Sequence, residues 1–350
     1  MCADMDLKNQ FQVERKVVCV QGLGFVGAAM ALAVASSRDE AGAPQYNVIG
    51  IDLPSDAGRK RVNSINRGVF PFACNDKKLG EAQQLAQQTG NFRAVTDPAY
   101  FQYADVVIVD INLDIMQTEE QEPSLDMAPF EVAIRTIGRY IRPETLVIVE
   151  TTVPPGTCEK IVYPLLKEEL KKRGLEKERF FVAHSYERVM PGENYFDSII
   201  NYWRVYSGID ETSADKCQSF LESIIKTDKY PLTRLQRTTA SEVAKVLENS
   251  YRAVTIAFME EWGRFAEAIG IDLYEVIDAI RMRPTHSNMR QPGFGVGGYC
   301  LTKDPYFAAL AAKDIFGLEA LDFPFSTQAV TVNHVMPLVS LDKVEHLLGG

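Results

Sequence analysis

Residues 17–27 read V-V-C-V-Q-G-L-G-F-V-G and decide the fold of the first half of the chain. A short apolar run leads into G-x-G-x-x-G, and small apolar residues typical of a helix follow at once. This order predicts a buried strand, a tight turn at Gly22 and a helix that opens directly after Gly27. Gly27 would allow close packing of helix and strand, so the stretch predicts a pyrophosphate site at the helix N-terminus.

An acidic residue at the end of the next predicted strand completes the pattern of a dinucleotide site. Residues 47–52 read as that strand, and Asp52 is its last residue. Its carboxylate can accept hydrogen bonds from ribose hydroxyls and would repel a 2′-phosphate, which favours NAD over NADP. The glycine turn alone is a weak signal, but strand, helix and acid together predict NAD as the cofactor.

The pattern of strands and helices changes near residue 210. Before that point, strand-like and helical runs alternate, which predicts an α/β fold with a Rossmann-type doubly wound parallel sheet over residues 1–210. After it, residues 239–280 are almost wholly helical in pattern and 320–350 resemble another long helix, so residues 211–350 are predicted to form an all-helical domain. The expected strands are 16–20, 47–52, 104–109, 145–150, 180–183 and 203–207, and the expected helices include 28–36, 127–140 and 159–173.

Charge and cysteine usage exclude several classes of partner. The chain has 37 Lys and Arg against 47 Asp and Glu, a formal net charge of −10, so neither nucleic acid nor an anionic membrane is an expected partner. Six cysteines without a C-x-x-C pair and only four histidines give a zinc site little support, and no metal is predicted. The scattered cysteines and the polar N-terminus predict a cytoplasmic protein.

A second glycine-rich segment runs up to a cysteine. Residues 291–304 read Q-P-G-F-G-V-G-G-Y-C-L-T-K-D, and such glycine density is expected where main chain bends around a ligand. The cation of Lys303 can stabilise the thiolate of Cys300, and Asp304 can position water or take a proton. The local sequence leaves open the alternative of a flexible loop with an incidental cysteine.

This segment resembles the catalytic loop of the UDP-glucose/GDP-mannose dehydrogenase family, whose members carry F-G-x-G-G-x-C-x-x-K-D. Residues 241–250, S-E-V-A-K-V-L-E-N-S, are similar to the family's helix with a catalytic lysine and asparagine, here Lys245 and Asn249, which lie four apart on one helical face. The resemblance runs from about residue 16 to 345, and several motifs occur in the family's order.

Two further segments carry the resemblance around the cofactor. Residues 150–157, E-T-T-V-P-P-G-T, resemble the family loop whose threonine, here Thr152, lies by the nicotinamide. Residues 61–71, R-V-N-S-I-N-R-G-V-F-P, resemble the segment after the second strand, with Arg61 near the cofactor phosphates.

The resemblance implies an NAD-dependent, four-electron oxidation of the primary alcohol of a nucleotide sugar to a carboxylate. Cys300 would capture the aldehyde as a thiohemiacetal, which becomes a thioester. Either Lys245 or a water held by Asn249 and Asp304 would be the base, Lys245 and Asn249 would stabilise each oxyanion, and Asp304 would position the hydrolytic water. The implied site residues are Cys300, Lys245, Asn249 and Asp304 for catalysis; Gly22, Gly24, Phe25, Val26, Gly27, Asp52, Arg61, Thr152 and Lys303 for the cofactor; and Glu187, Arg188, Phe294, Gly295 and Gly297 for the substrate.

Residues 185–192, S-Y-E-R-V-M-P-G, bear on the sugar. UDP-glucose-oxidising relatives usually show P-E-F-L-x-E-G there, and their second Glu, which helps thioester hydrolysis, aligns with Pro191, so the hydrolytic base stays open. E-R-V-x-P-G instead resembles the branch that acts on UDP-N-acetylglucosamine or its manno or galacto epimer. UDP-glucose or GDP-mannose is the alternative substrate. Glu187 and Arg188 are candidate substrate contacts; the alternative is that they merely pair at a strand end.

The end of the chain and its oligomeric state raise further alternatives. Family members normally carry a third, C-terminal α/β domain that binds the nucleotide sugar; this chain stops at Gly350 and is expected to lack it. A catalytically weak NAD-binding module is therefore one alternative, and a two-domain hydroxyacid dehydrogenase, which needs no such cysteine loop, is another. The resemblance also implies a homodimer through the amphipathic helix from Thr239 onward, whereas packing within one chain is the simpler alternative.

Overall fold

The computed structural model describes residues 15–118, 121–189 and 192–349 and divides into two compact units. The first comprises the chain up to Leu113 together with Asp126–Thr151 and Gly156–Glu242, and the second comprises Asp114–Leu125, Thr152–Pro155 and the chain from Val243 onward. The first unit thus extends beyond residue 210, where the sequence pattern changes. The helix that follows packs on its sheet, and a short strand after that helix pairs with the sheet edge.

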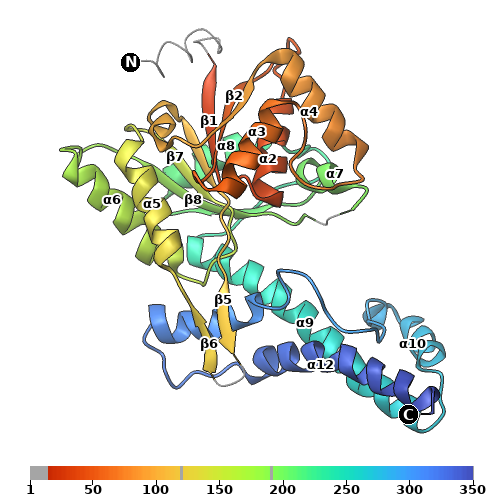
Figure 1. The fold of residues 1–350 in the computed structure, drawn as a ribbon. Coiled ribbons are helices and arrows are strands. Elements are labelled where there is room, and N and C mark those ends of the chain that lie inside the picture. The colour runs from red at the N-terminus through yellow and green to blue at the C-terminus, as the bar shows by residue number, and fades with distance from the viewer. Residues whose placement is uncertain (1–14, 119–120, 190–191, 350) are drawn as a thin grey trace. The chain divides into compact units, whose positions relative to one another are not determined.

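The first unit is built on an eight-stranded sheet in the order β10-β9-β8-β7-β4-β1-β2-β3. Its strands β1, β2, β7 and β8 are labelled in Figure 1. The strands from β3 to β8 in this order run parallel, β9 is antiparallel to β8, and β10 is parallel to β9. The strands are β1 (Lys16–Gln21), β2 (Tyr46–Ile51), β3 (Phe92–Val95), β4 (Val106–Val109), β7 (Leu146–Val149), β8 (Phe181–Tyr186), β9 (Val205–Gly208) and β10 (Thr233–Arg234).

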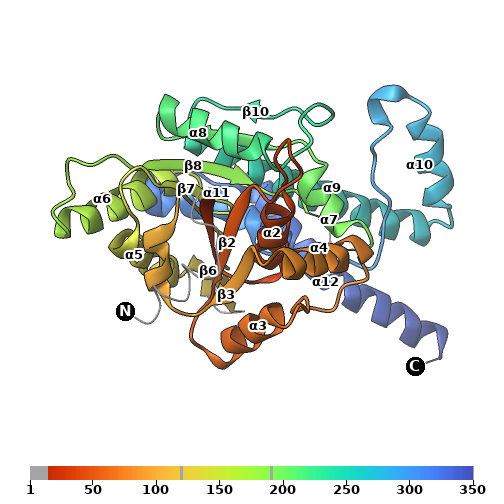
Figure 2. The ribbon, with the colours of Figure 1, turned by 90° about the horizontal axis from the view of Figure 1, so that it is seen from above.

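Every residue of β2, β4, β7 and β8 is buried, as expected for parallel strands that helices cover on both faces (Figure 2). The predicted doubly wound sheet is therefore confirmed. The short strands β3 and β10 were not predicted: β3 carries an arginine, and both residues of β10 are exposed. The helices of this unit are α2 (Phe25–Ser36), α3 (Asp56–Asn66), α4 (Lys77–Thr89), α5 (Ala128–Tyr140), α6 (Tyr163–Lys172), α7 (Tyr195–Ile200) and α8 (Glu211–Glu222).

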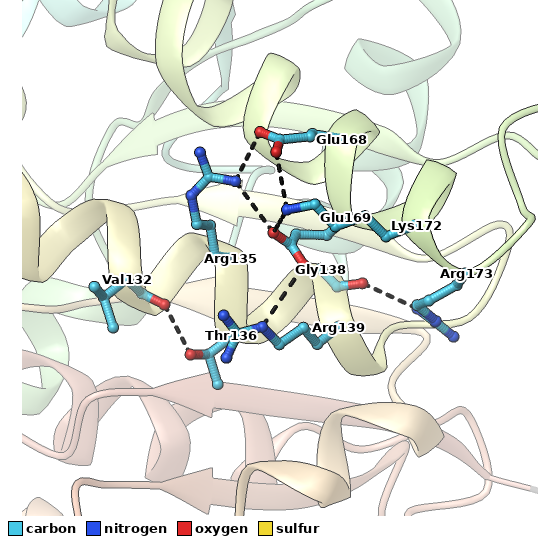
Figure 3. Close-up of polar contacts among 9 residues, drawn as sticks. All are labelled: Val132, Arg135, Thr136, Gly138, Arg139, Glu168, Glu169, Lys172 and Arg173. Carbon is cyan, nitrogen blue, oxygen red and sulfur yellow. Dashed lines mark hydrogen bonds and ion pairs between the residues drawn. The ribbon is translucent and has the colours of Figure 1, made fainter.

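Helices α5 and α6 pack closely and are joined by an ion-pair network (Figure 3). Gly138 permits the close approach, because a Cβ there would lie 2.8 Å from the Cβ of Glu169. Arg135 forms ion pairs with Glu168 (2.7 Å) and Glu169 (3.1 Å), and Lys172 pairs with the same two carboxylates at 2.8 Å each. The cations lower the pKa of both glutamates, that of Glu168 to about 2.

We expect this network to make the first unit sensitive to acid. Because the folded-state pKa values are lowered, the pairs stabilise the fold above the ordinary carboxyl pKa of 4.5, and this contribution is lost as the pH falls from there toward about 2. The Glu168→Gln variant should therefore lose less unfolding free energy than the wild type over that range, by a small margin because Glu168 is exposed. Urea unfolding at pH 5 and pH 3 measures the difference; equal losses in the two proteins would contradict it.

The second unit is mainly helical, as predicted. It holds the long helix α9 (Thr238–Ala268) from Val243 onward, followed by α10 (Leu273–Arg281), α11 (Phe307–Leu310) and α12 (Pro324–Leu347). An antiparallel hairpin of β5 (Ile115–Thr118) and β6 (Gln121–Leu125) completes the unit. The hairpin was not predicted. Among the described residues, no helix has the length and apolarity needed to cross a bilayer.

The expected continuous helical stretch over 239–280 is interrupted after Ala268. Gly270 adopts a left-handed φ of 73°, which ends a helix readily, and the Asp272 side chain accepts a hydrogen bond from the Tyr274 N–H to begin α10. Gly270 and Asp272 are therefore the local signals that divide this region into two helices.

Candidate active site

The first unit brings the ends of β1, β4 and β7 together, since these strands are neighbours in the sheet. The strand order reverses at β1, with β2 and β3 on one side and β4 and β7 on the other. In doubly wound sheets the crevice at such a reversal, outside the carboxyl ends of the strands, is where nucleotides bind.

The glycine turn after β1 has the geometry that a pyrophosphate site needs. Gly22 has a φ of 91°, and a Cβ there would lie 2.2 Å from the backbone oxygen of Asp110. A Cβ at Gly27 would lie 2.0 Å from the backbone oxygen of Gly22, whereas one at Gly24 would meet no described heavy atom within 4 Å. Helix α2 starts at Phe25 without an acidic residue in its first turn. Gly24 therefore leaves space at the helix N-terminus, where N–H groups can bind an anion.

The two other predicted cofactor residues of this turn lie in the first turn of α2. Val26 is half-buried. The Phe25 ring packs against the ring of Tyr195 with centroids 4.6 Å apart, and the Tyr195 hydroxyl donates to the Phe25 carbonyl at 2.9 Å. Tyr195 thus holds the start of α2 from the side of α7, a contact the sequence did not predict.

Asp52 follows β2 directly, as predicted, but its carboxylate is bound by Arg61 of α3. The guanidinium forms a fork, with Nε 2.7 Å from Oδ2 and Nη2 3.0 Å from Oδ1, and the Leu53 N–H donates to Oδ1 at 2.7 Å. A carboxylate offers about four acceptor positions, so one remains for a ribose hydroxyl. The resemblance placed Arg61 near the cofactor phosphates; in the structure it pairs with the acid expected at the ribose.

The loop after β7 begins with a buried ion pair between Glu150 and Arg204. The Thr151 hydroxyl then bridges the neighbouring loop after β4, since it accepts from the Ile111 N–H at 2.9 Å and donates to the Ile111 carbonyl at 3.0 Å. Thr152, the residue expected by the nicotinamide, is the next residue and is half-buried. The contacts of Glu150 and Thr151 thus hold the start of the loop in which Thr152 lies.

Glu187 and Arg188 follow β8, and each has a contact of its own. Glu187 accepts from the Val189 N–H at 2.5 Å, and Arg188 lies over the Tyr186 ring and donates to its hydroxyl at 3.3 Å. Both side chains are half-buried. Pro191, where UDP-glucose-oxidising relatives carry their second Glu, lies outside the described residues.

The second unit holds all four predicted catalytic residues and brings Asn249 into contact with Asp304. Helix α9 carries Lys245 and Asn249, both buried. The Asn249 amide donates to Oδ2 of Asp304 at 2.6 Å, and the Lys303 ammonium donates to Oδ1 at 2.7 Å. Asp304 is 0% exposed, and both of its oxygens are engaged. It therefore orients Asn249 and neutralises Lys303, and its role with the hydrolytic water stays a prediction.

Lys303, like Asp304, has side-chain contacts within the second unit. Its ammonium is paired with Asp304 and lies 4.6 Å and 4.5 Å from the ring centroids of Tyr299 and Phe307. A cation held in this way has its charge offset by a neighbouring carboxylate. Lys303 is thus placed to anchor the loop, and its roles as a cofactor contact and as a cation beside the thiolate stay predictions.

The thiol of Cys300 is exposed, while the loop around it is held by backbone bonds. The Asp304 and Lys303 N–H groups donate to the Cys300 carbonyl at 2.9 Å and 3.2 Å. Because Cys300 is exposed, a small molecule can reach it, unlike the buried Cys19 and Cys217, whose thiol pKa values burial raises.

The predicted substrate residues of the glycine loop divide into two kinds. Phe294 and Gly297 are exposed. Gly295 has a φ of 101°, and a Cβ there would lie 2.9 Å from both the Asn333 backbone oxygen and the Met336 Cβ of α12. Packing against α12 thus explains Gly295, and a substrate contact is not needed to account for it.

Glu242 is a buried residue that sequence reasoning missed. It lies in the first turns of α9, and its two carboxylate oxygens accept from the N–H groups of Gly156 and Cys158 at 2.6 Å and 2.8 Å. Burial raises its pKa to about 7, against the effect of these donors. The signal was its position three residues before Lys245, on the same helical face.

Two family models match most of the chain. The NAD binding domain of the UDP-glucose/GDP-mannose dehydrogenase family matches residues 16–226, and the central domain of the same family matches residues 239–335. These ranges include the glycine turn in the first match and Lys245, Asn249 and Cys300 in the second.

Individual relatives agree with these matches. The chain is 31% identical over 333 residues to a UDP-N-acetyl-D-mannosamine dehydrogenase of Methanocaldococcus jannaschii, covering 95% of this chain and 69% of the relative. It is 28% identical to an NDP-N-acetyl-D-galactosaminuronic acid dehydrogenase of Ralstonia nicotianae, covering 97% and 73%. The solved structure of a UDP-D-ManNAc dehydrogenase from Pyrococcus horikoshii superposes with a TM-score of 0.77 at 28% identity, covering 95% and 71%.

The chain thus spans roughly two thirds to three quarters of the length of these relatives. The glycine turn, the acid after β2 and the helical unit with its cysteine loop all fall within the matched ranges. The chain belongs to the UDP-glucose/GDP-mannose dehydrogenase family and is an NAD-dependent oxidoreductase of the nucleotide-sugar dehydrogenase type.

Proposed function

We propose that this protein oxidises the C6 primary alcohol of a UDP-N-acetylhexosamine to the uronic acid through a covalent intermediate on Cys300. The observation that carries the proposal is the arrangement in the second unit: an exposed thiol on a loop whose end, Asp304, is hydrogen-bonded to Asn249 of α9. A two-step oxidation needs a group that retains the aldehyde formed midway, and a reachable thiol can do so.

NAD, bound at the glycine turn, supplies the hydride acceptor for each of the two oxidations. In the first, Lys245 takes the alcohol proton. The Cys300 thiolate then adds to the aldehyde carbon, and the resulting alkoxide takes a proton to give a thiohemiacetal. Loss of hydride from that carbon and of the hydroxyl proton to a base would give a thioester, and attack by water would release the carboxylate and free the thiol.

Asn249 would stabilise the oxyanions that form during the reaction. Its amide nitrogen carries two hydrogens, of which Asp304 accepts one, so the second can donate to the oxyanion that develops at each tetrahedral stage. A preorganised donor of this kind is typically worth about 3 kcal/mol. Asp304 acts through Asn249 by fixing the direction of that amide.

The substrate class is supported by the relatives and by the segment after β8. Relatives of M. jannaschii and R. nicotianae are named for N-acetylated mannosamine and galactosaminuronic acid, and E-R-V at residues 187–189 resembles the same branch. The Arg188 guanidinium lies beside Tyr186 at the carboxyl end of β8 and is the side chain that we propose contacts the substrate, together with Glu187 and Phe294.

A panel of nucleotide sugars tests this proposal. NADH production should be seen with at least one of UDP-N-acetylglucosamine, UDP-N-acetylmannosamine and UDP-N-acetylgalactosamine, with a kcat/KM at least about tenfold above that for UDP-glucose or GDP-mannose, since a site built to bond the acetamido group discriminates against sugars lacking it. Faster turnover of UDP-glucose would overturn the assignment of the sugar. Tight NAD binding without NADH from any sugar would favour the non-catalytic module.

We also propose that the protein is a cytoplasmic homodimer. The face of α9 opposite Asn249 is apolar and exposed, with Leu247 63% accessible, and a second copy of this chain would cover it. The cysteines in the described residues form no disulfide, which suits a reducing compartment. The exposed apolar residues of this face are Leu247, Tyr251, Phe258, Trp262, Phe265 and Ile269.

The oligomeric state gives a direct check of the proposed dimer. Sedimentation of the wild type should give twice the chain mass, and Phe258→Glu should shift the equilibrium toward the monomer because it places a charge in the apolar face. The matched control is Glu261→Gln, a change on an exposed side chain of the same helix. A monomeric wild type would contradict this part of the proposal.

A further inference from the structure

The glycine-rich segment that leads to Cys300 is exposed, with open space around three of its glycines. Residues 297–300 are exposed, and Cβ atoms at Gly293, Gly297 and Gly298 would meet no described heavy atom within 4 Å. Glycine-rich main chain has high conformational entropy, so it holds a single conformation only where its ends are fixed. The position of the sulfur therefore depends on the anchors at the two ends of the loop.

The C-terminal anchor is Asp304, which is buried and bound by Asn249. The N-terminal anchor is Glu260 of α9. Glu260 is 2% exposed, and its Oε1 accepts a hydrogen bond from the Gly293 N–H at 2.8 Å. Nearby, the Pro292 ring packs against Gly263 of the same helix, where a Cβ would lie 3.0 Å from the Pro292 Cβ.

The groups around Glu260 act in opposite directions on the pKa of its carboxyl group. Burial raises its pKa, while the Gly293 N–H, Arg264 and Lys343 act in the opposite direction and favour the ionised form. Lys343 is itself paired with Glu267. Burial of a carboxylate costs free energy unless hydrogen bonds compensate it, and the bond from the Gly293 N–H offsets part of this cost for Glu260.

Helix α12 packs against Gly295, which follows Gly293 in the N-terminal part of the loop. Pro337 has no N–H, so the Asn333 carbonyl, four residues earlier, lacks its normal partner within the helix. Gly295 approaches at this point, and a Cβ on it would lie 2.9 Å from the Asn333 oxygen. The Asn333 side chain in turn donates to the Ala253 carbonyl of α9 at 3.0 Å, which ties α12 to α9.

Both ends of the loop are therefore attached to the same face of helix α9. Asn249 and Glu260 are eleven residues apart, which is about three turns of α-helix, so their side chains leave α9 on the same side. Asn249 holds the loop after the cysteine through Asp304, and Glu260 holds it before the cysteine through Gly293.

We infer that Glu260 is a positioning residue: by accepting the Gly293 N–H it fixes the N-terminal end of the cysteine loop and sets where the Cys300 sulfur stands relative to Lys245 and Asn249. The consequence for turnover rests on the proposed function. The restraint on the loop does not, and it can be measured in the protein without substrate.

Hydrogen–deuterium exchange of the peptides that cover residues 291–299 measures the restraint. Glu260→Met fills a similar space but cannot accept a hydrogen bond, and it should speed exchange in these peptides by at least about tenfold, as expected for loss of a bond to a charged acceptor. Glu260→Gln keeps an acceptor oxygen and should leave exchange within about threefold of the wild type. Glu261→Gln, one residue along on the exposed side, is the matched control and should change nothing.

Turnover of a UDP-N-acetylhexosamine gives the second readout. Glu260→Met should lower kcat by about ten- to a hundredfold, since displacement of a reacting group by about 1 Å has effects of that size, and Glu260→Gln should restore most of it. The affinity for NAD, whose site lies in the first unit, should stay within about twofold in both variants.

Wild-type exchange and kcat in Glu260→Met would overturn the inference, and so would a Glu260→Gln protein as impaired as Glu260→Met. Should Glu260→Met not fold, the comparison of Glu260→Gln with Glu260→Asp decides, because the shorter aspartate must withdraw from Gly293 and is expected to loosen the loop. Fast exchange in Glu260→Met together with an inactive wild type would leave the restraint established and the proposed function rejected.

Discussion

Replacing Cys300 by serine is expected to abolish formation of the uronic acid, with kcat reduced at least about a thousandfold, as for loss of other covalent nucleophiles. A serine hydroxyl is a weak nucleophile near neutral pH unless an adjacent base activates it, so the aldehyde would not be captured. Binding of NAD should be unchanged, because the glycine turn and Asp52 belong to the first unit. Acid production and NAD titration of the variant measure the two effects.

Cys74→Ser is the matched control for this experiment. Cys74 is a free, half-buried cysteine of the first unit, and its loss should leave acid formation unchanged. Wild-type acid production by Cys300→Ser would show that the thiol is not the nucleophile. A variant that also failed to bind NAD would indicate a general loss of structure.

The second large effect is expected from Asp304→Ala, which should destabilise the second unit by about 3–5 kcal/mol. The change leaves the buried Lys303 ammonium without its carboxylate and the Asn249 amide without its acceptor. Removing one partner of a buried ion pair has this cost because the remaining charge stays desolvated. Urea unfolding followed by the fluorescence of Trp262, which lies in this unit, measures the loss.

The double variant Lys303→Met with Asp304→Ala separates stability from catalysis. Removal of both charges should recover most of the lost unfolding free energy, since no unpaired charge is then buried. Turnover should not recover, because Asn249 still lacks the group that orients it. An unfolding free energy for the double variant as low as that of Asp304→Ala would show that the pair does not act as proposed.

The parts of the fold that the sequence predicts well are those in which local patterns carry the information. The apolar runs of β1, β2, β4, β7 and β8 predict buried parallel strands, and the spacing of Gly22, Gly24 and Gly27 predicts the turn between β1 and α2. The structure accounts for Gly22 and Gly27 by steric contacts with neighbouring backbone, which only a residue without a side chain tolerates.

The sequence does not predict which side chains pair with one another in the folded protein. Arg61 pairs with Asp52 nine positions earlier, and Lys303 pairs with the residue next to it, so both cations have partners that a motif does not reveal. Asp304 and Asn249 are 55 residues apart and meet only because the loop folds back onto α9. Motifs identify which residue types are present, while the direction of each bond depends on tertiary packing.

The hydrogen bond of Glu260 could not be predicted from the sequence either. A glutamate in the middle of a long helix reads as a solvated side chain, and its neighbour Glu261 is indeed exposed. The helical period places Glu260 on the face of Asn249, but its partner is a backbone N–H of a distant loop, which no residue type specifies. The break between α9 and α10 was, by contrast, readable from Gly270 and Asp272.

The most direct test of the account is a mass spectrum of the Cys300 peptide from protein quenched in acid during turnover with NAD and each UDP-N-acetylhexosamine. The account predicts an added mass equal to the UDP-sugar thioester on that peptide and on no other cysteine, and its absence when NAD is omitted. Uronic acid accumulating in the same samples while Cys300 stays unmodified, with the adduct absent even at the earliest quench times, would contradict covalent catalysis by this thiol.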